Sequence, residues 1–235
     1  MKVVSFDCAT KSLGISIINY NMQFTEQVSA AQQEYISAKT NSKDINEIVL
    51  HYIELLDKIT NLVDNKISIE YLDVVDIIPG KKVKETDIVE RTAGLYDCLT
   101  ELDNKLCCRD QLPQEGYIFL IEYQMGPNDK SRAVASQIMI FFSKYCGKYG
   151  PSIIKVIGPS LKNKVTIGGD DAHYSNFIEK YTTNYAANKN HAKYNFLKLL
   201  NHLGKEHMIS NIKKSNIDDI ADSVMMSIAY YLSIR

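Results

Sequence analysis

The sequence predicts an α/β protein with one mixed β-sheet flanked by helices. Two observations lead to this prediction. The first part of the chain contains three segments with strand character before its first long helical pattern. After that helix, short apolar strands alternate with segments whose apolar residues recur at helical spacing. A cluster of strands followed by alternating strands and helices is typical of a mixed sheet covered by helices.

The first elements are strands. Residues 2–8 form an apolar run that predicts a buried strand, and residues 12–20 alternate partly between apolar and polar side chains. The tripeptide Asn19-Tyr20-Asn21 favours a hairpin turn into a third strand over residues 22–29. These segments predict an antiparallel start to the sheet.

A long helix and a second strand come next. Residues 44–65 repeat apolar side chains at helical spacing, and residues 67–78 return to strand character before the turn at Pro79-Gly80. Thr86 and Asp87 are suitable caps for a helix over about residues 87–106.

The remaining elements alternate between strands and helices. The run 117–122 predicts a short strand, and a helix over 132–147 is expected to end near Gly147. Gly150-Pro151 then breaks the chain before a strand over 153–157. The last predicted segments are a polar loop with Gly and Asp over 163–188, a helix over 189–203 and a largely apolar closing helix over 217–233.

Length and composition indicate one soluble globular domain. The chain has 235 residues, of which 45% are hydrophobic and 23% charged, and residues 30–66 are predicted to be a mainly helical insertion.

No apolar run approaches the roughly 20 residues that span a bilayer. The N-terminus enters a strand directly, without the layout of a signal peptide. The five cysteines include no C-x-x-C pair, so we expect reduced cysteines in a cytoplasmic protein.

The net charge of −1 hides an asymmetry along the chain. Residues 1–128 hold 12 Lys/Arg and 20 Asp/Glu, whereas residues 129–214 hold 14 Lys/Arg and 5 Asp/Glu. A basic segment is either a solvated lysine-rich face or a phosphate-binding surface. Because this segment lies between two groups of acids, we favour the phosphate-binding surface.

The acids at three places in the chain are candidate metal ligands. Asp7 ends the first strand, Glu122 ends the strand over 117–122, and Asp218, Asp219 and Asp222 begin the closing helix. Each acid alone is explained more simply, as a turn, surface or helix-start residue. Asp219 and Asp222, however, project from one helix face, and only small or apolar residues follow Asp222. A buried carboxylate needs a donor or a cation, and carboxylates are the ligands that Mg²⁺ prefers.

At these residues the chain resembles the RuvC-like Holliday junction resolvases of the RNase H-like superfamily, especially those of poxviruses and other large cytoplasmic DNA viruses. The similar segments are residues 5–14, residues 120–124 and residues 217–223. A strand followed by Gly158-Pro159-Ser160-Leu161-Lys162 and a lysine-bearing helix near 188–193 also agree with the family pattern. The resemblance covers most of the chain except residues 30–66.

The resemblance implies an RNase H-like fold and a metal-dependent endonuclease. In such an enzyme two Mg²⁺ ions, for which Mn²⁺ can substitute, activate the attacking water and stabilise the leaving 3′ oxygen. The metal and catalytic ligands would be Asp7, Glu122, Asp219 and Asp222. The expected DNA-binding residues are Gln124, which would contact DNA or orient Glu122, and the basic residues Lys130, Arg132, Lys162, Lys164, Lys189 and Lys193.

The implied substrate is a four-way DNA junction, cut by paired symmetric nicks during recombination, repair or the resolution of viral genome concatemers. The two-fold symmetry of a junction implies a homodimer. The long apolar stripes at 44–65 and 87–106 are candidates for its interface. If the viral resemblance holds, the protein acts in the host cytoplasm, at the site of viral replication.

Other functions share parts of this pattern. A ribonuclease H acting on RNA–DNA hybrids would use the same metal chemistry. The start of the chain also resembles the first phosphate loop of actin-like ATPases and sugar kinases, but Gly168-Gly169 lies in a polar context that does not match their second loop. A non-catalytic DNA-binding module would not require all four acids. An exonuclease of the DEDD type needs a second acid two residues after Asp7, where Ala9 stands.

Overall fold

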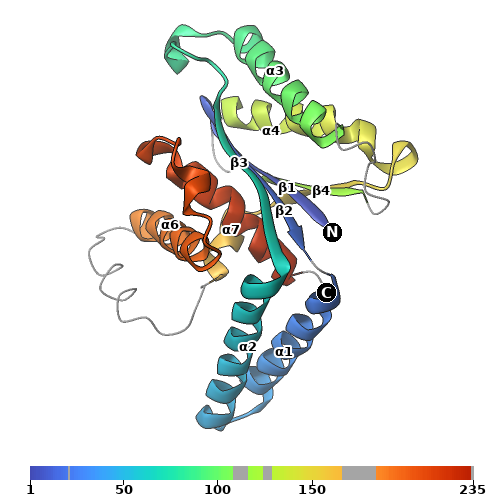
Figure 1. Ribbon diagram of the computed structural model, residues 1–235, viewed down its shortest axis with the longest axis vertical. Coiled ribbons are helices and arrows are strands. Elements are labelled where there is room, and N and C mark those ends of the chain that lie inside the picture. The colour runs from blue at the N-terminus through green and yellow to red at the C-terminus, as the bar shows by residue number, and fades with distance from the viewer. Residues whose placement is uncertain (21, 108–115, 124–128, 166–183, 234–235) are drawn as a thin grey trace.

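The computed structural model describes residues 1–20, 22–107, 116–123, 129–165 and 184–233, and shows one five-stranded sheet with helices on both faces (Figure 1). The strands are β1 (Lys2–Cys8), β2 (Ser12–Tyr20), β3 (Ile67–Asp76), β4 (Tyr117–Glu122) and β5 (Ile153–Ile157). The helices are α1 (Met22–Asn41), α2 (Ile45–Lys66), α3 (Ile88–Cys107), α4 (Asp129–Phe142), α6 (Asn184–His202) and α7 (Ile217–Ser233). The predicted α/β fold with a mixed sheet is confirmed.

The sheet has the strand order β3-β2-β1-β4-β5, with β1 at its centre. β2 is antiparallel to both β1 and β3, whereas β1, β4 and β5 run parallel to one another. Apolar side chains explain the central position of β1, because Val3, Val4 and Phe6 are fully buried from the two faces. Three parallel neighbours therefore end at the same edge of the sheet.

Two separate apolar clusters hold the helices against the sheet. On one face, α6 and α7 pack against the sheet through side chains such as Phe196, Leu200, Val224 and Ile228. On the other face, α3 and α4 pack through side chains such as Leu99, Ile138 and Phe142. Figure 1 shows these two pairs of helices on opposite sides of the strands. Of these helices, α7 lies across β1 and β2, which places its first turns near the start of β2.

The third strand expected over residues 22–29 is wrong, because α1 begins at Met22. Gln and Glu within this segment, and Ala30 and Ala31 directly after it, favour a helix over a strand. α1 and α2 form a helical hairpin that projects from one end of the sheet (Figure 1), and the antiparallel third strand is β3, beyond the hairpin. The helical insertion expected over 30–66 is therefore present but begins earlier.

Other boundaries differ by smaller amounts. α4 ends at Phe142 rather than near Gly147, and short 3-10 turns follow it up to Tyr149. α6 begins at Asn184, five residues before the predicted start. Most of the polar loop expected over 163–188 lies outside the described residues. Within the described ranges, every helix is too short or too polar to span a bilayer.

Candidate metal centre

The carboxyl ends of the parallel strands bring two of the predicted acids together. Phe6 pairs with Ile121 across β1 and β4, so that Asp7 and Glu122 are the next residues on the two strands. The third parallel strand, β5, ends at Ile157 and leads into the 3-10 helix Leu161–Lys164. This edge of the sheet thus receives an acid from β1, an acid from β4 and Lys162 from the segment after β5.

α7 adds Asp219 and Asp222 to the same edge. Its buried face contains Ile220, Ala221 and Val224, all without solvent exposure, which fixes the rotation of the helix against the sheet. Asp222 lies one turn beyond Asp219, and both side chains are partly buried beside the inner face of the helix. The close approach of α7 to the sheet requires Gly14 on β2, since a Cβ atom there would lie 2.3 Å from the Asp219 backbone oxygen.

Lys162 lies between the acids. Its Nζ is 2.9 Å from Glu122 Oε1 and 2.5 Å from Asp222 Oδ2, and all three side chains are mostly buried. Although burial favours a neutral amine, the charges of Asp222, Glu122 and Asp7 raise the pKa of Lys162 above its ordinary value. The ammonium group therefore stays charged and neutralises part of this acidic edge.

Asp7 is a strongly perturbed acid of the group. Burial, a hydrogen bond with the Glu122 carboxyl group and the negative charges of Glu122 and Asp222 raise the pKa of Asp7 well above its ordinary value, against the opposing charge of Lys162. Burial, together with the charges of Asp7 and Glu122, raises the pKa of the neighbouring Cys8 thiol. One ammonium does not balance these three acids, so without a further cation the arrangement favours a proton on Asp7, which a bound divalent cation would displace.

The donor set fits a hard divalent cation such as Mg²⁺. It consists of carboxylate oxygens from four acids, which is the ligand chemistry that Mg²⁺ and Mn²⁺ prefer. In the described part of the chain, these acids do not place three ligand atoms within 4.8 Å of one another, and Lys162 lies between two of them. A cation held by both Glu122 and Asp222 would have to take the place that the Lys162 ammonium occupies here.

Asp219 is oriented by a residue to which sequence reasoning assigns no role. The Ser12 hydroxyl donates a 2.7 Å hydrogen bond to Asp219 Oδ2, across 207 positions in the chain. Ser12 is the first residue of β2, directly after the turn in which the Ala9 N–H donates to the Ser12 carbonyl oxygen. The only sequence signal for Ser12 and Gly14 is that both lie in the segment 5–14 that resembles the resolvases.

The other predicted site residues are spread more widely. Lys193 on α6 pairs with Asp218 on α7 at 3.0 Å, beside the acidic edge. Lys130 and Arg132 are exposed near the start of α4, where Arg132 pairs with Asp129 of its own helix. Gln124 and the side chains of Lys164 and Lys189 lie outside the described residues, so their assignment to DNA binding stays a prediction.

No family model and no curated protein match the chain. Several solved structures are similar to it along nearly its whole length. One is the fowlpox virus Holliday junction resolvase, with 14% identity, a TM-score of 0.47 and complete coverage of both chains. A second is the complex of fowlpox virus resolvase with its substrate Holliday junction DNA, with 14% identity and a TM-score of 0.47, where 99% of this chain and 98% of that chain are covered. A third is Thermus thermophilus RuvC in complex with a Holliday junction substrate, with 10% identity and a TM-score of 0.49, where 99% of this chain and 94% of that chain are covered.

The similarity to resolvases that the motifs predict is thus found again by the structural comparison, as a likeness of fold. Identities of 10–14% and TM-scores below 0.5 do not transfer an activity to this chain.

Proposed function

We propose that the chain is a metal-dependent endonuclease that resolves four-way DNA junctions by paired nicks. The observation that carries this proposal is the convergence of Asp7, Glu122 and Asp222 around Lys162 at one sheet edge. Such a concentration of buried carboxylates is costly for folding alone, and its oxygen ligands suit divalent cations that act on phosphodiesters. Divalent cations bound there would activate a water molecule and stabilise the leaving oxygen.

The residues of the chain have distinct parts in this proposal. Asp7 and Glu122 are held by neighbouring rigid strands, and Asp222 by a helix packed on the same sheet, which fixes their relative positions. Ser12 holds the Asp219 carboxylate in one orientation. Lys162 offsets part of the negative charge before metal and DNA arrive, and its released ammonium is then available to a phosphate oxygen.

A cleavage panel tests the function directly. Purified protein with Mg²⁺ is offered a four-way junction, a flap, a linear duplex and an RNA–DNA hybrid of related sequence. We expect paired symmetric nicks in the junction and little cleavage of the linear duplex. Cleavage restricted to the RNA strand of the hybrid would replace the proposal with a ribonuclease H function, and cleavage of none of the four would refute a nuclease.

Replacing Lys162 with Met tests its role between the acids. Without divalent cation, Glu122, Asp222 and Asp7 then face one another without their neighbouring ammonium, and we expect the free energy of unfolding to fall by about 3 kcal/mol. Mg²⁺ should restore more stability to Lys162→Met than it adds to the wild type, because it replaces the lost positive charge. Urea unfolding with and without Mg²⁺ measures both effects.

The control for this substitution is Lys155→Met, on the exposed side of β5. It removes the same side chain from a position outside the acid cluster and should leave the stability and its Mg²⁺ dependence unchanged. If Lys162→Met also behaves like the wild type in both respects, the described ion pairs do not couple Lys162 to the metal site.

Lys193 is the described candidate for a contact with the DNA backbone. It is partly exposed, lies in the basic segment and pairs with Asp218 next to the acidic edge. For Lys193→Ala we expect severalfold weaker binding to all junction sequences alike, and a salt dependence reduced by about one counterion, because phosphate contacts release counterions without reading bases. Junction titrations at several salt concentrations measure this, with Lys39→Ala on the hairpin as the matched control. An unchanged salt slope would give Lys193 a structural role.

A homodimer belongs to the same proposal, because a four-way junction presents two equivalent strands to be cut. α2 is the better of the two predicted interfaces, since Val49, Leu50 and Ile53 lie next to one another on the helix and are each about half exposed. Light scattering at micromolar concentration should show a dimer that Leu50→Glu with Ile53→Glu converts to a monomer. A wild-type monomer that still makes paired nicks would refute dimerisation.

A cytoplasmic location stays a prediction, which imaging of the tagged protein would test.

A further inference from the structure

The helical hairpin holds a second group of metal-ligating side chains, far from the acids in the fold. Glu34 comes from α1, and His51 and Glu54 come from α2. Each offers a ligand atom, and these atoms lie within 4.8 Å of one another. His51 Nδ1 is 3.2 Å from Glu54 Oε2, one turn further along α2. In the described part of the chain, this is the only group of three that meets this spacing.

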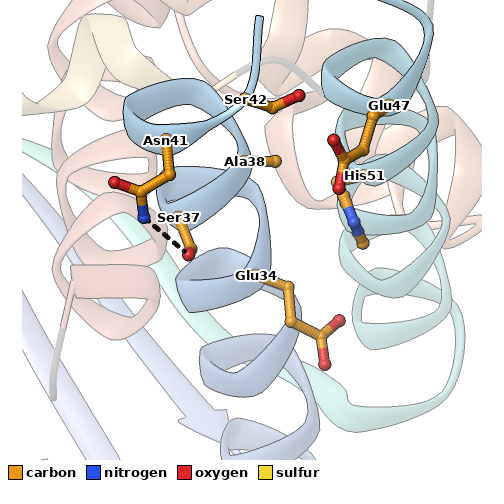
Figure 2. A pocket seen from close by; sticks show the side chains of 7 residues that line it. All are labelled: Glu34, Ser37, Ala38, Asn41, Ser42, Glu47 and His51. Carbon is orange, nitrogen blue, oxygen red and sulfur yellow. Dashed lines mark hydrogen bonds between the residues drawn. The ribbon is translucent and has the colours of Figure 1, made fainter. Parts of the chain in front are cut away.

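Two members of the group, Glu34 and His51, also line an open pocket between the two helices. This pocket has a volume of about 340 Å³, and the third member of the group, Glu54, is not part of its lining. Figure 2 shows Glu34 on one helix and His51 and Glu47 on the other. The His51 side chain is less exposed than that of Glu54, with 27% of its surface accessible to solvent against 49% for Glu54. The imidazole therefore lies at the base of the site and the carboxylates at its rim.

The donor chemistry of this group differs from that of the acidic sheet edge. One imidazole nitrogen with two carboxylates is a ligand set for zinc and other first-row transition ions, whereas Mg²⁺ prefers oxygen ligands alone. Around a tetrahedral zinc ion with bonds of roughly 2.0–2.1 Å, ligand atoms lie about 3.4 Å apart. Glu34 and Glu54 are exposed, so rotations of their side chains can bring the carboxylates closer to a shared ion.

We propose that Glu34, His51 and Glu54 form a zinc site that ties α1 to α2. An ion bound there joins residues from two neighbouring helices, so it stabilises the hairpin against separation of its helices. This site shares no residue with the acid cluster and does not depend on the proposed nuclease function. The alternative is that His51 and Glu54 form only an ordinary exposed pair within α2, with Glu34 nearby by chance.

The test titrates zinc chloride into the full chain in the presence of millimolar Mg²⁺, which occupies oxygen-only sites. Calorimetry should give zinc binding that is at least tenfold weaker in His51→Gln and in Glu34→Gln than in the wild type. Saturating zinc should raise the Tm of the wild type by roughly 2–4 °C, and should raise that of the variants less. His207→Gln, which removes an exposed histidine from the segment before α7, is the matched control and should bind like the wild type.

Two outcomes overturn the proposal. One is equal zinc affinity and equal Tm increase in the wild type, His51→Gln and Glu34→Gln, which places any bound zinc elsewhere. The other is the absence of measurable zinc binding by a folded wild-type protein. Neither outcome bears on junction cleavage, and a failure of the cleavage panel does not affect the zinc titration, so the two proposals fail separately.

Discussion

Glu122→Gln should abolish cleavage of a four-way junction while leaving junction binding intact. The substitution keeps the shape of the side chain but removes the charge that pairs with Lys162 and would hold a divalent cation. A loss of about 4 kcal/mol of transition-state stabilisation corresponds to a cleavage rate at least about a thousandfold lower. Binding should stay within about twofold, or become slightly tighter, because one negative charge near the DNA phosphates is removed.

One gel assay scores binding and nicking on the same junction. Glu101→Gln, on the exposed surface of α3, is the control for the chemical change itself and should cleave normally. Asp219→Asn and Asp222→Asn should resemble Glu122→Gln, and combining them should add little, since ligands of one site fail as a unit. Wild-type activity should require Mg²⁺ or Mn²⁺ and fail in Ca²⁺. Near-normal nicking by Glu122→Gln, or full activity in EDTA, would exclude the mechanism.

The positions of the acids were predictable because local patterns set them. An apolar run that ends in an acid predicts a strand with a carboxylate at its end, and parallel neighbours end at one edge. Asp7 and Glu122 follow this rule, and the spacing of Asp219 and Asp222 predicts one face of a helix. The structure brings Asp7, Glu122 and Asp222 together as expected.

Other features of the site depend on contacts that no local pattern contains. Lys162 looks like a phosphate-binding lysine in the sequence, whereas the structure places its ammonium between Glu122 and Asp222, which are 40 and 60 positions away. The hydrogen bond from Ser12 to Asp219 spans almost the entire chain. The start of α1 was missed for a different reason, because a plausible turn at residues 19–21 predicts a hairpin that the helix-favouring residues after it override.

The contact between Gly14 and α7 makes a second large effect predictable. A Cβ atom at position 14 would lie 2.3 Å from the backbone oxygen and 2.7 Å from the carbonyl carbon of Asp219. The atoms that would collide with this Cβ belong to the backbone of α7, whose inner face is fully buried, and the Cβ itself would sit on β2, an inner strand of the sheet. The clash therefore cannot be relieved by the rotation of a flexible side chain. Gly14→Ala therefore forces α7 away from β2 along its first turns.

We expect Gly14→Ala to lower the free energy of unfolding by about 3 kcal/mol, at the upper end of overpacking effects. Urea unfolding measures this loss, and Gly158→Ala is the control, because nothing lies within 4 Å of a Cβ atom there. Any Gly14→Ala protein that still folds should also cleave junctions more slowly, since the displaced turn carries Asp219 away from Ser12. Wild-type stability and activity in Gly14→Ala would mean that α7 does not lie against β2 as described. The fold and the candidate site would then fail together, because the same close contact that packs the helix also delivers its carboxylates to the sheet edge.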